Sequence, residues 1–456
     1  MLSHIHSIFY FRGEIMDNFY LKIIRNGDKY AALNLKTLGL FKVSECEAKI
    51  LESFYNHDRD FDYVSSLLHI EKKKCRDLIN VFETPLGPIE NLKLEPAELL
   101  LMISQDCNLR CKYCYATGGS YGEKRRFMDT KTAEKAIDVA FSLGNIKSIV
   151  FFGGEPLLNF ELIKHLVNYT KKRDIVYGFV TNGTLLTDEM IKFFKKNNFY
   201  ITISLDGPKE VNDANRIYPD SRGTYDVIIK TIEKLKENKI KFSLEATFTK
   251  TALKKGYRAR DILEFLYRYT DSIKITPVGF IDDPSLTLSK EDLIEYFDDC
   301  YSFALDKIRN DKPINIFDIT MLIYRIVSWK KHTCDVLCPS IAKRLTVFPD
   351  GNVYPCYLIK EEDYCYGNIF NDNFKEVFSE KAKDISRKLS RKNLKQKEWY
   401  IPLLTDICFG YIKKENDKLE IEETMKEVLS EVLERFIKEL ITIDDWNKVI
   451  KNISGG

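Results

Sequence analysis

The sequence lacks the features that would place this chain in a membrane or on a polyanion. It contains no run near the ~18 consecutive apolar residues that a membrane helix needs, and Met1 to Ile15 lack the basic start, apolar stretch and cleavage site of a secretory signal. Lys and Arg number 70 against 68 Asp and Glu, so the net charge is only +2 and favours neither nucleic acid nor an anionic membrane as the partner. It also lacks low-complexity tracts and internal repeats. We therefore expect a cytoplasmic protein with no nucleic-acid or membrane partner.

What the chain does contain is enough apolar material for large cores. Its 456 residues are 44% hydrophobic and 30% charged, which excludes wholesale disorder and fibrous architectures. At roughly 150 residues per domain, two or three globular domains are expected. There are eleven cysteines. Because the reducing cytosol disfavours structural disulfides, clustered cysteines indicate metal or redox chemistry.

Residues 1–84 predict a small domain of three strands followed by three helices. Strands are expected at Phe19–Arg25 and Lys29–Leu35, joined by a tight turn at Asn26-Gly27-Asp28, with a third near Leu40. Helical spacing then covers Ser44–Tyr55, Phe61–Leu68 and Glu71–Phe82. This order resembles a winged-helix domain, whose exposed strand edge can bind an extended peptide. A packing appendage and DNA binding are the alternatives. Met16 is an alternative start.

Strand and helix signals alternate in residues 98–281, after a Gly- and Pro-containing linker at 85–97. Six strands are expected, at Glu98–Ser104, Ser148–Phe152, Ile175–Thr181, Tyr200–Leu205, Ile240–Thr247 and Ser272–Pro277. This α/β pattern predicts a parallel sheet, either doubly wound or an incomplete barrel. In both, functional residues gather at the carboxyl ends of the strands.

The remainder is expected to hold a helical connection at 282–333, a loop-rich cysteine region at 334–410 and a helical tail at 411–456. Residues 418–441 have apolar positions at helical spacing, which predicts an amphipathic helix docked on its own domain or, alternatively, on a partner. Cys46, Cys75 and Cys300 are expected to be buried small hydrophobes.

Three cysteines, Cys107, Cys111 and Cys114, follow the first of the six strands within eight residues. Three thiolates in a short loop can bind three irons of a cubane cluster and leave the fourth without a protein ligand. That open iron can bind a small chelating molecule and pass an electron into it.

The order of motifs resembles the radical S-adenosylmethionine (SAM) superfamily. The CxxxCxxC triplet is followed, at successive strand ends, by Gly153-Gly154-Glu155-Pro156, by Asn182 in Thr-Asn-Gly-Thr, and by Ser204 in Ser-Leu-Asp-Gly, with Arg216 beyond. The resemblance implies a partial (β/α)6 barrel, a [4Fe-4S] cluster on the triplet, and SAM as the cofactor. It assigns the SAM amino group to Gly153–Pro156, the ribose or carboxylate to Ser204 and Arg216, and the adenine to Tyr113.

The cysteines near the C-terminus resemble the start of the SPASM extension, which binds auxiliary iron–sulfur clusters. Cys338, Gly351 and Cys356 fit its CX9-15GX4C pattern, but the later four-cysteine block is missing. One auxiliary cluster is therefore expected, with Cys334, Cys338, Cys356 and Cys408 as ligands and Cys365 as a substitute; a second is not. Four thiolates could instead bind a structural zinc.

Together these resemblances imply a maturase of ribosomally made peptides. The N-terminal domain would bind the leader of a precursor peptide and raise the effective concentration of the core peptide at the barrel. A 5'-deoxyadenosyl radical would remove a hydrogen atom from the peptide, and a substrate cysteine would form a thioether there. Carbon–carbon crosslinking, epimerisation, backbone excision and sulfatase-type formylglycine formation are the alternatives, besides a zinc-structured binding module without catalysis. The chemistry also requires an external one-electron reductant of the flavodoxin or ferredoxin type.

Overall fold

The computed structural model describes residues 21–35, 39–83, 95–279, 281, 283–327, 336–390, 393–394, 398–400, 403, 412–415 and 418–453. Its centre is a parallel sheet that curves into a partial barrel. The six strands are β4 (Glu98–Ser104), β5 (Ser148–Gly153), β6 (Val176–Thr181), β7 (Phe199–Ser204), β8 (Phe242–Phe248) and β9 (Ser272–Pro277). Each pairs in parallel with the next. The six predicted strands are confirmed, and the partial barrel is the correct one of the two arrangements.

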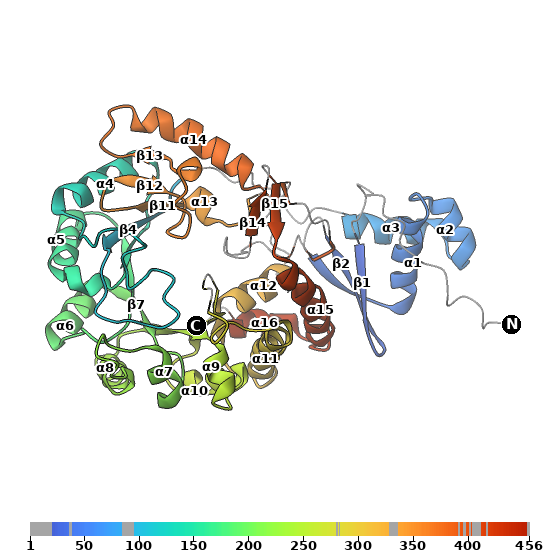
Figure 1. Ribbon diagram of the computed structural model, residues 1–456. Helices are drawn as coiled ribbons and strands as arrows, with labels where there is room; N and C mark the ends of the chain where they lie inside the picture. The colour runs from blue at the N-terminus through green and yellow to red at the C-terminus, as the bar shows by residue number, and fades with distance from the viewer. Residues whose placement is uncertain are drawn as a thin grey trace.

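Helices connect these strands and cover the outside of the sheet (Figure 1). They are α4 (Thr130–Leu143), η1 (Pro156–Asn159), α5 (Phe160–Thr170), α6 (Asp188–Lys196), α7 (Lys209–Asn215), α8 (Tyr225–Glu237), α9 (Lys250–Lys254) and α10 (Ala259–Tyr267). Alternate strand residues such as Ile149, Ile201 and Leu244 are fully buried beneath them. The other half of each strand therefore faces the inside of the barrel, because side chains alternate along a strand.

The sheet extends beyond the six strands on both sides. On one side, β10 (Asn315–Ile316) pairs in parallel with β9. In the chain, β10 follows α11 (Lys290–Arg309) and precedes α12 (Phe317–Val327). On the other side, β11 (Arg344–Val347) pairs in parallel with β4, and the antiparallel strands β12 (Asn352–Tyr354) and β13 (Gly367–Asn368) follow. The sequence predicted neither β10 nor this extension, in which the cysteine-rich region is joined to the barrel through backbone hydrogen bonds.

Further helices belong to the C-terminal part of the chain. They are α13 (Ser340–Lys343), η2 (Glu362–Tyr364), α14 (Phe374–Lys388), α15 (Glu423–Leu440) and α16 (Trp446–Ile453), with a hairpin of β14 (Ile412–Glu415) and β15 (Lys418–Ile421) before α15. The amphipathic helix was predicted from residue 418, but its first four residues form β15 instead. α14 lies in the region that we expected to be rich in loops.

The N-terminal part forms a three-stranded antiparallel sheet of β1 (Leu21–Asn26), β2 (Lys29–Asn34) and β3 (Gly39–Val43), followed by α1 (Glu45–Asn56), α2 (Phe61–Leu68) and α3 (Lys72–Glu83). Ser44 caps α1 through a capping box with Glu47, as its position before the apolar pattern predicts. Cys75 is buried on α3, as expected, but Cys46 in the first turn of α1 is exposed, so that prediction is wrong.

Both faces of this N-terminal sheet are covered. Ala32 and Phe41 pack against α1–α3, whereas Ile24, Leu33 and Leu40 belong to the same buried cluster as α12 and α15. Figure 1 shows α15 between the N-terminal sheet and the barrel. Polar contacts accompany this packing: the Lys22 ammonium lies 3.0 Å from Glu434 on α15, and the Lys29 ammonium donates to the Thr442 carbonyl. No helix in the described part of the chain is long and apolar enough to cross a membrane.

Candidate functional site

The cysteine triplet lies in the loop that follows β4, at the carboxyl ends of the barrel strands. Backbone hydrogen bonds tie this loop to the segment after α7: the Arg110 N–H donates to the Ile217 carbonyl at 2.7 Å, and the Lys112 N–H to the Asn215 carbonyl at 3.0 Å. Cys107, Cys111 and Cys114 are each partly exposed. The loop therefore presents all three thiols from a backbone that the barrel holds in place.

The surroundings of the thiols fit an iron–sulfur cluster. Burial raises the pKa of Cys107 to about 11 and that of Cys111 to about 12, so these groups need a bound cation to become thiolates. The Leu109 and Gly118 N–H groups each lie 3.4 Å from a sulfur, on Cys107 and Cys114 respectively. Such donors stabilise charge on cluster sulfurs. In the described residues no three metal-binding side chains lie close enough to share one ion; a cubane cluster binds each thiolate through a different iron.

The two glycines after β5 allow close contact between loops. A Cβ on Gly153 would lie 2.0 Å from the Ser104 carbonyl oxygen, and one on Gly154 would lie 2.3 Å from that of Asp106. The Gly154 and Glu155 N–H groups donate to these same carbonyls, at 2.7 and 2.8 Å. The absence of side chains at the two glycines thus allows the end of β5 to contact the start of the cysteine loop. Their contact with a ligand stays a prediction.

Glu155 connects the ends of β5 and β6 through a fully buried carboxyl group. It accepts hydrogen bonds from the Leu157 N–H at 3.0 Å, the Thr181 hydroxyl at 2.8 Å and the Asn182 N–H at 2.8 Å. Burial raises its pKa to about 7, although these three donors oppose the shift. Pro156 begins η1 directly after it. Three donors leave about one acceptor position on the carboxylate for a ligand.

Asn182 joins the end of β6 to the cysteine loop. Its amide nitrogen donates to Asn108 at 2.9 Å and lies 3.8 Å from the Cys107 sulfur. Its amide oxygen accepts from the Thr184 N–H and hydroxyl. Asn182 therefore positions the first cysteine, a contact that its motif alone did not reveal.

Tyr113, Asp206 and Arg216 form a buried polar network that links the cysteine loop to β7. The Asp206 carboxylate accepts from the Tyr113 hydroxyl at 2.7 Å, from the Arg216 Nε at 2.9 Å and from the Thr247 N–H at 3.1 Å. The guanidinium also lies over the Tyr113 ring. Burial opposes the charge on Arg216, but Asp206 together with Tyr113 and Cys111 outweighs this effect and raises its pKa.

Asp206 is the site residue that our sequence reasoning missed, although it stands in the quoted Ser-Leu-Asp-Gly motif. Ser204, two residues earlier, is buried at the end of β7. The structure thus brings Tyr113 and Arg216 together at Asp206. Ser204, at the end of β7, pairs with Glu245 of β8. The contacts of Tyr113, Ser204 and Arg216 with SAM stay predictions.

The three described cysteines of the C-terminal region lie around β12 and β13. Cys338 is partly exposed with its sulfur 3.1 Å from the Ser340 hydroxyl, Cys356 is buried, and the Cys365 thiol lies 3.7 Å from the Gly367 carbonyl. Cys365 packs with Leu100 and Tyr354. Cys334 and Cys408 lie outside the described residues, so the choice of four ligands among the five stays a prediction. Cys300 is fully buried on α11, as expected.

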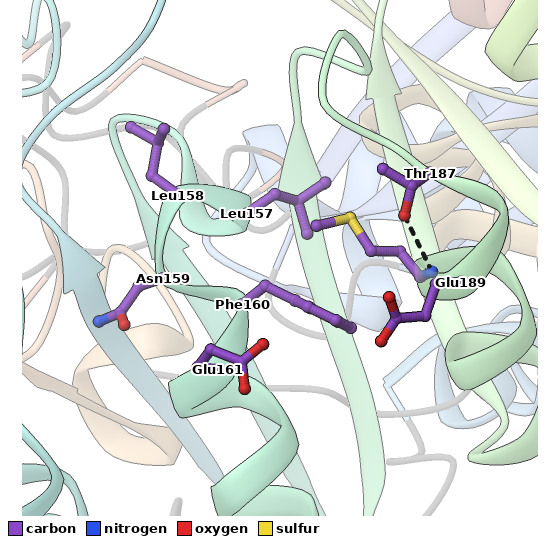
Figure 2. Close-up of a pocket in the computed structure, with 8 residues that line it drawn as sticks. Leu157, Leu158, Asn159, Phe160, Glu161, Thr187 and Glu189 are labelled. Atoms are coloured by element: carbon purple, nitrogen blue, oxygen red, sulfur yellow. Dashed lines mark hydrogen bonds between the residues drawn. The ribbon is translucent and has the colours of Figure 1, made fainter.

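A hollow of about 360 Å³ lies on the outer surface, where η1 and the start of α5 meet α6. Figure 2 shows its lining, with Leu157, Phe160 and Glu189 directed toward one another and Thr187 bonded to the α6 backbone. Its lining residues belong to η1 and to the start of α5 and α6, together with Thr187 before α6. We therefore place the functional site inside the barrel and not in this hollow.

Comparisons with known proteins identify two domains in the chain. Residues 101–273 match the radical SAM superfamily, and residues 338–399 match the SPASM iron–sulfur cluster-binding domain. The chain therefore contains a radical SAM domain and a SPASM domain. The radical SAM domain implies SAM and a [4Fe-4S] cluster, and the SPASM domain implies auxiliary iron–sulfur binding.

Two curated relatives are similar over most of these regions. A cysteine-type anaerobic sulfatase-maturating enzyme of Clostridium novyi is 26% identical over 62% of this chain and 78% of its own length. The radical SAM cyclopropyl synthase TigE of Paramaledivibacter caminithermalis is 30% identical over 59% of this chain and 58% of its length. The solved structure of native anSMEcpe with bound AdoMet has a TM-score of 0.63 at 23% identity, covering 76% of this chain and all of that one. It supports the fold.

Proposed function

We propose that the protein modifies a ribosomally made precursor peptide, joining a cysteine sulfur to a carbon of another residue as a thioether. The observation that carries the proposal is the cysteine loop, held by Asn182 and the paired glycines at the mouth of a barrel whose inner face remains accessible. When bound, SAM and the [4Fe-4S] cluster supply a 5'-deoxyadenosyl radical that abstracts hydrogen.

The chain's own residues would bind and orient the reactants. In this proposal Glu155, Ser204 and Arg216 hold the SAM methionine and ribose. Tyr113 holds the adenine, and Asp206 fixes both Tyr113 and Arg216 by hydrogen bonds. The SPASM region reaches the same space, because Tyr357, next to Cys356, stacks on Phe152 of β5 with ring centroids 4.4 Å apart. An auxiliary cluster on Cys356 and its neighbours would thus lie near the bound peptide.

The similarity to a cysteine-type sulfatase-maturating enzyme supports a second candidate, the oxidation of a substrate cysteine without a crosslink. The two candidates differ in product mass: a thioether crosslink leaves the peptide two hydrogens lighter, whereas formylglycine formation removes two hydrogens and also replaces the sulfur with oxygen. Mass spectrometry of cysteine-containing peptides encoded in short neighbouring reading frames, after anaerobic reaction, separates them.

The enzyme itself is tested by iron loading and SAM cleavage. Anaerobic reconstitution should give absorbance near ~400 nm that zinc thiolates lack, and dithionite should then release 5'-deoxyadenosine. Cys107→Ala, Cys111→Ala and Cys114→Ala should each abolish that release, whereas Cys46→Ala, on an exposed helix face, should not. Protein that takes up only zinc would contradict the proposal.

Leader binding is proposed for the outer edge of β3, because the described N-terminal sheet ends at this strand. The two-residue turn pairs Asn26 with Lys29, and the alternation of antiparallel pairs then directs the Leu40 and Lys42 backbone groups away from β2. Lys42→Pro removes one outward N–H. It should reduce peptide modification and spare SAM cleavage, whereas Lys42→Met keeps the N–H and should modify normally.

A further inference from the structure

The inner face of the barrel is divided into an apolar half and a polar half. Leu100 and Met102 of β4 pack there with Val150 and Phe152 of β5. On the opposite side, Glu245 of β8 and Lys274 of β9 are neighbours in register. Their side chains remain 23% and 42% exposed although both stand on strands in the middle of the sheet. The polar half is thus open to a molecule that enters the barrel.

Lys274 has hydrogen-bonding capacity that the described residues do not use. Its ammonium lies 2.8 Å from the Glu245 carboxylate, and we find no second acceptor for it among the described residues. An ammonium carries three N–H donors. Since the side chain is accessible, the remaining donors face the inside of the barrel.

Thr276 adds a second unused group two residues further along β9. Its hydroxyl oxygen is shielded from water and lacks a hydrogen-bond partner within the described part of the chain. A buried hydroxyl without a partner is unfavourable. Because alternate residues of a strand share a face, it lies on the same side as Lys274, nearer the carboxyl end of the strand and the cysteine loop.

The charges around these donors disfavour an anionic ligand. Glu245 neutralises Lys274, and Asp206 neutralises Arg216 at 2.9 Å. Asp318 adds a further negative charge close enough to raise the pKa of Lys274 after the larger effect of Glu245. A carboxylate entering here would be repelled, whereas a neutral carbonyl oxygen would accept from both donors.

The strand positions that bear the two donors repeat at the interval of a peptide backbone. Residues i and i+2 of a strand lie roughly 6.6 to 6.8 Å apart, which is also the repeat of carbonyl groups on one side of an extended peptide. Tyr357 lies across from them, stacked on Phe152 and, with ring centroids 6.3 Å apart, on Tyr115. These rings would cover the side chains of such a peptide.

We propose that Lys274, held by Glu245, and Thr276 form a substrate-binding site that binds two backbone carbonyl groups of the peptide in extended form. The inference rests on the proposed function, since it names how that substrate is held. A site that binds the backbone places the peptide without selecting its side chains, so specificity would be left to other contacts.

The test measures binding without chemistry. The SAM-loaded, reconstituted holoenzyme is titrated anaerobically by calorimetry with a neutral probe, a pentaalanine peptide that is acetylated at its N-terminus and amidated at its C-terminus. Loss of a charge-assisted hydrogen bond in Lys274→Met should weaken binding about tenfold, and Thr276→Val should weaken it about threefold. Lys164→Met, which removes an outer ammonium paired with Glu161, should leave the affinity unchanged.

Thr276→Val keeps the proposal testable if Lys274→Met fails to fold, because the lost hydroxyl has no protein partner among the described residues. Wild-type affinity in both variants would overturn the proposal, as would no binding by the wild type. A second probe carries an aspartate in place of the central alanine of the blocked pentaalanine peptide. If the acidic probe binds and needs Lys274, while the neutral probe does not bind, then the site recognises a side chain. This result would also overturn the proposal. Failure of the proposed function would appear separately, as absence of a peptide product two hydrogens lighter after anaerobic reaction.

Discussion

At the scale of single residues, the site depends on side chains whose polar groups are satisfied by the protein. Asp206 has no exposed side-chain surface and accepts from Tyr113, Arg216 and the Thr247 backbone. Removing one member of such a buried pair costs more than the pair contributes, because the other charge stays buried without a partner.

Asp206→Asn should therefore destabilise the protein by about 3 to 5 kcal/mol and lower SAM binding, since Arg216 and Tyr113 lose their anchor. Urea unfolding and SAM titration measure the two effects. Asp220→Asn is the matched control: it breaks a 2.7 Å pair with Arg222 that is largely exposed, so it should leave the unfolding free energy nearly unchanged, because exposed ion pairs contribute little. Equal effects of both substitutions would refute the role of Asp206.

Glu155 should make stability depend on pH. Its folded pKa, about 7, is raised above the ordinary value of 4.5 by burial, so the unfolded chain releases this proton first. The contribution of Glu155 should fall as the pH rises from 4.5 to 7 and stay constant above, by on the order of 3 kcal/mol in total. Glu155→Gln should remove this slope from the unfolding free energy measured across that range; a slope identical to that of the wild type would exclude the effect.

At the scale of elements, the strands of the barrel and the order of the motifs were predictable from the sequence. Continuous apolar strands such as Leu99–Ile103 and the helical spacing between them depend on local pattern. Asp206 and the short β10 and β11 were missed, because their structure depends on partners distant in the chain. β11, for example, is held by pairing with β4 about 245 residues earlier.

The contact between β5 and the cysteine loop can be tested at Gly153. Its φ is +147° and a Cβ would clash with the Ser104 carbonyl, so Gly153→Ala should displace the loop and lower the iron content after reconstitution. Gly256→Ala controls for backbone strain alone, because Gly256 also has positive φ but has nothing within 4 Å. It should cost about 1 kcal/mol and leave the iron content unchanged.

At the scale of the whole molecule, the N-terminal sheet is part of the main core. The sequence predicted a separate domain at residues 1–84 followed by a linker, and pattern alone could not show that Ile24, Leu33 and Leu40 share a buried cluster with α12 and α15. Amphipathic strands show which residues are buried but not what covers them.

A fragment of residues 95–456 should accordingly be less stable than the full chain, since it exposes the apolar surface of α15 and α12. We expect a lower unfolding temperature and aggregation on heating, measured by scanning calorimetry and light scattering. An unfolding temperature equal to that of the full chain would instead indicate an independently folded N-terminal domain.

The double cover of this sheet also has a consequence for synthesis on the ribosome. The face that bears Leu33 can be buried only after α15 has been synthesised, and α15 begins about 390 residues later in the chain. At 5 to 20 residues per second, this apolar face of the sheet therefore stays exposed on the nascent chain for roughly 20 to 80 s. Chaperones can therefore bind the nascent chain during this interval. The first strands complete their packing only after α15, one of the last helices of the chain, has left the ribosome.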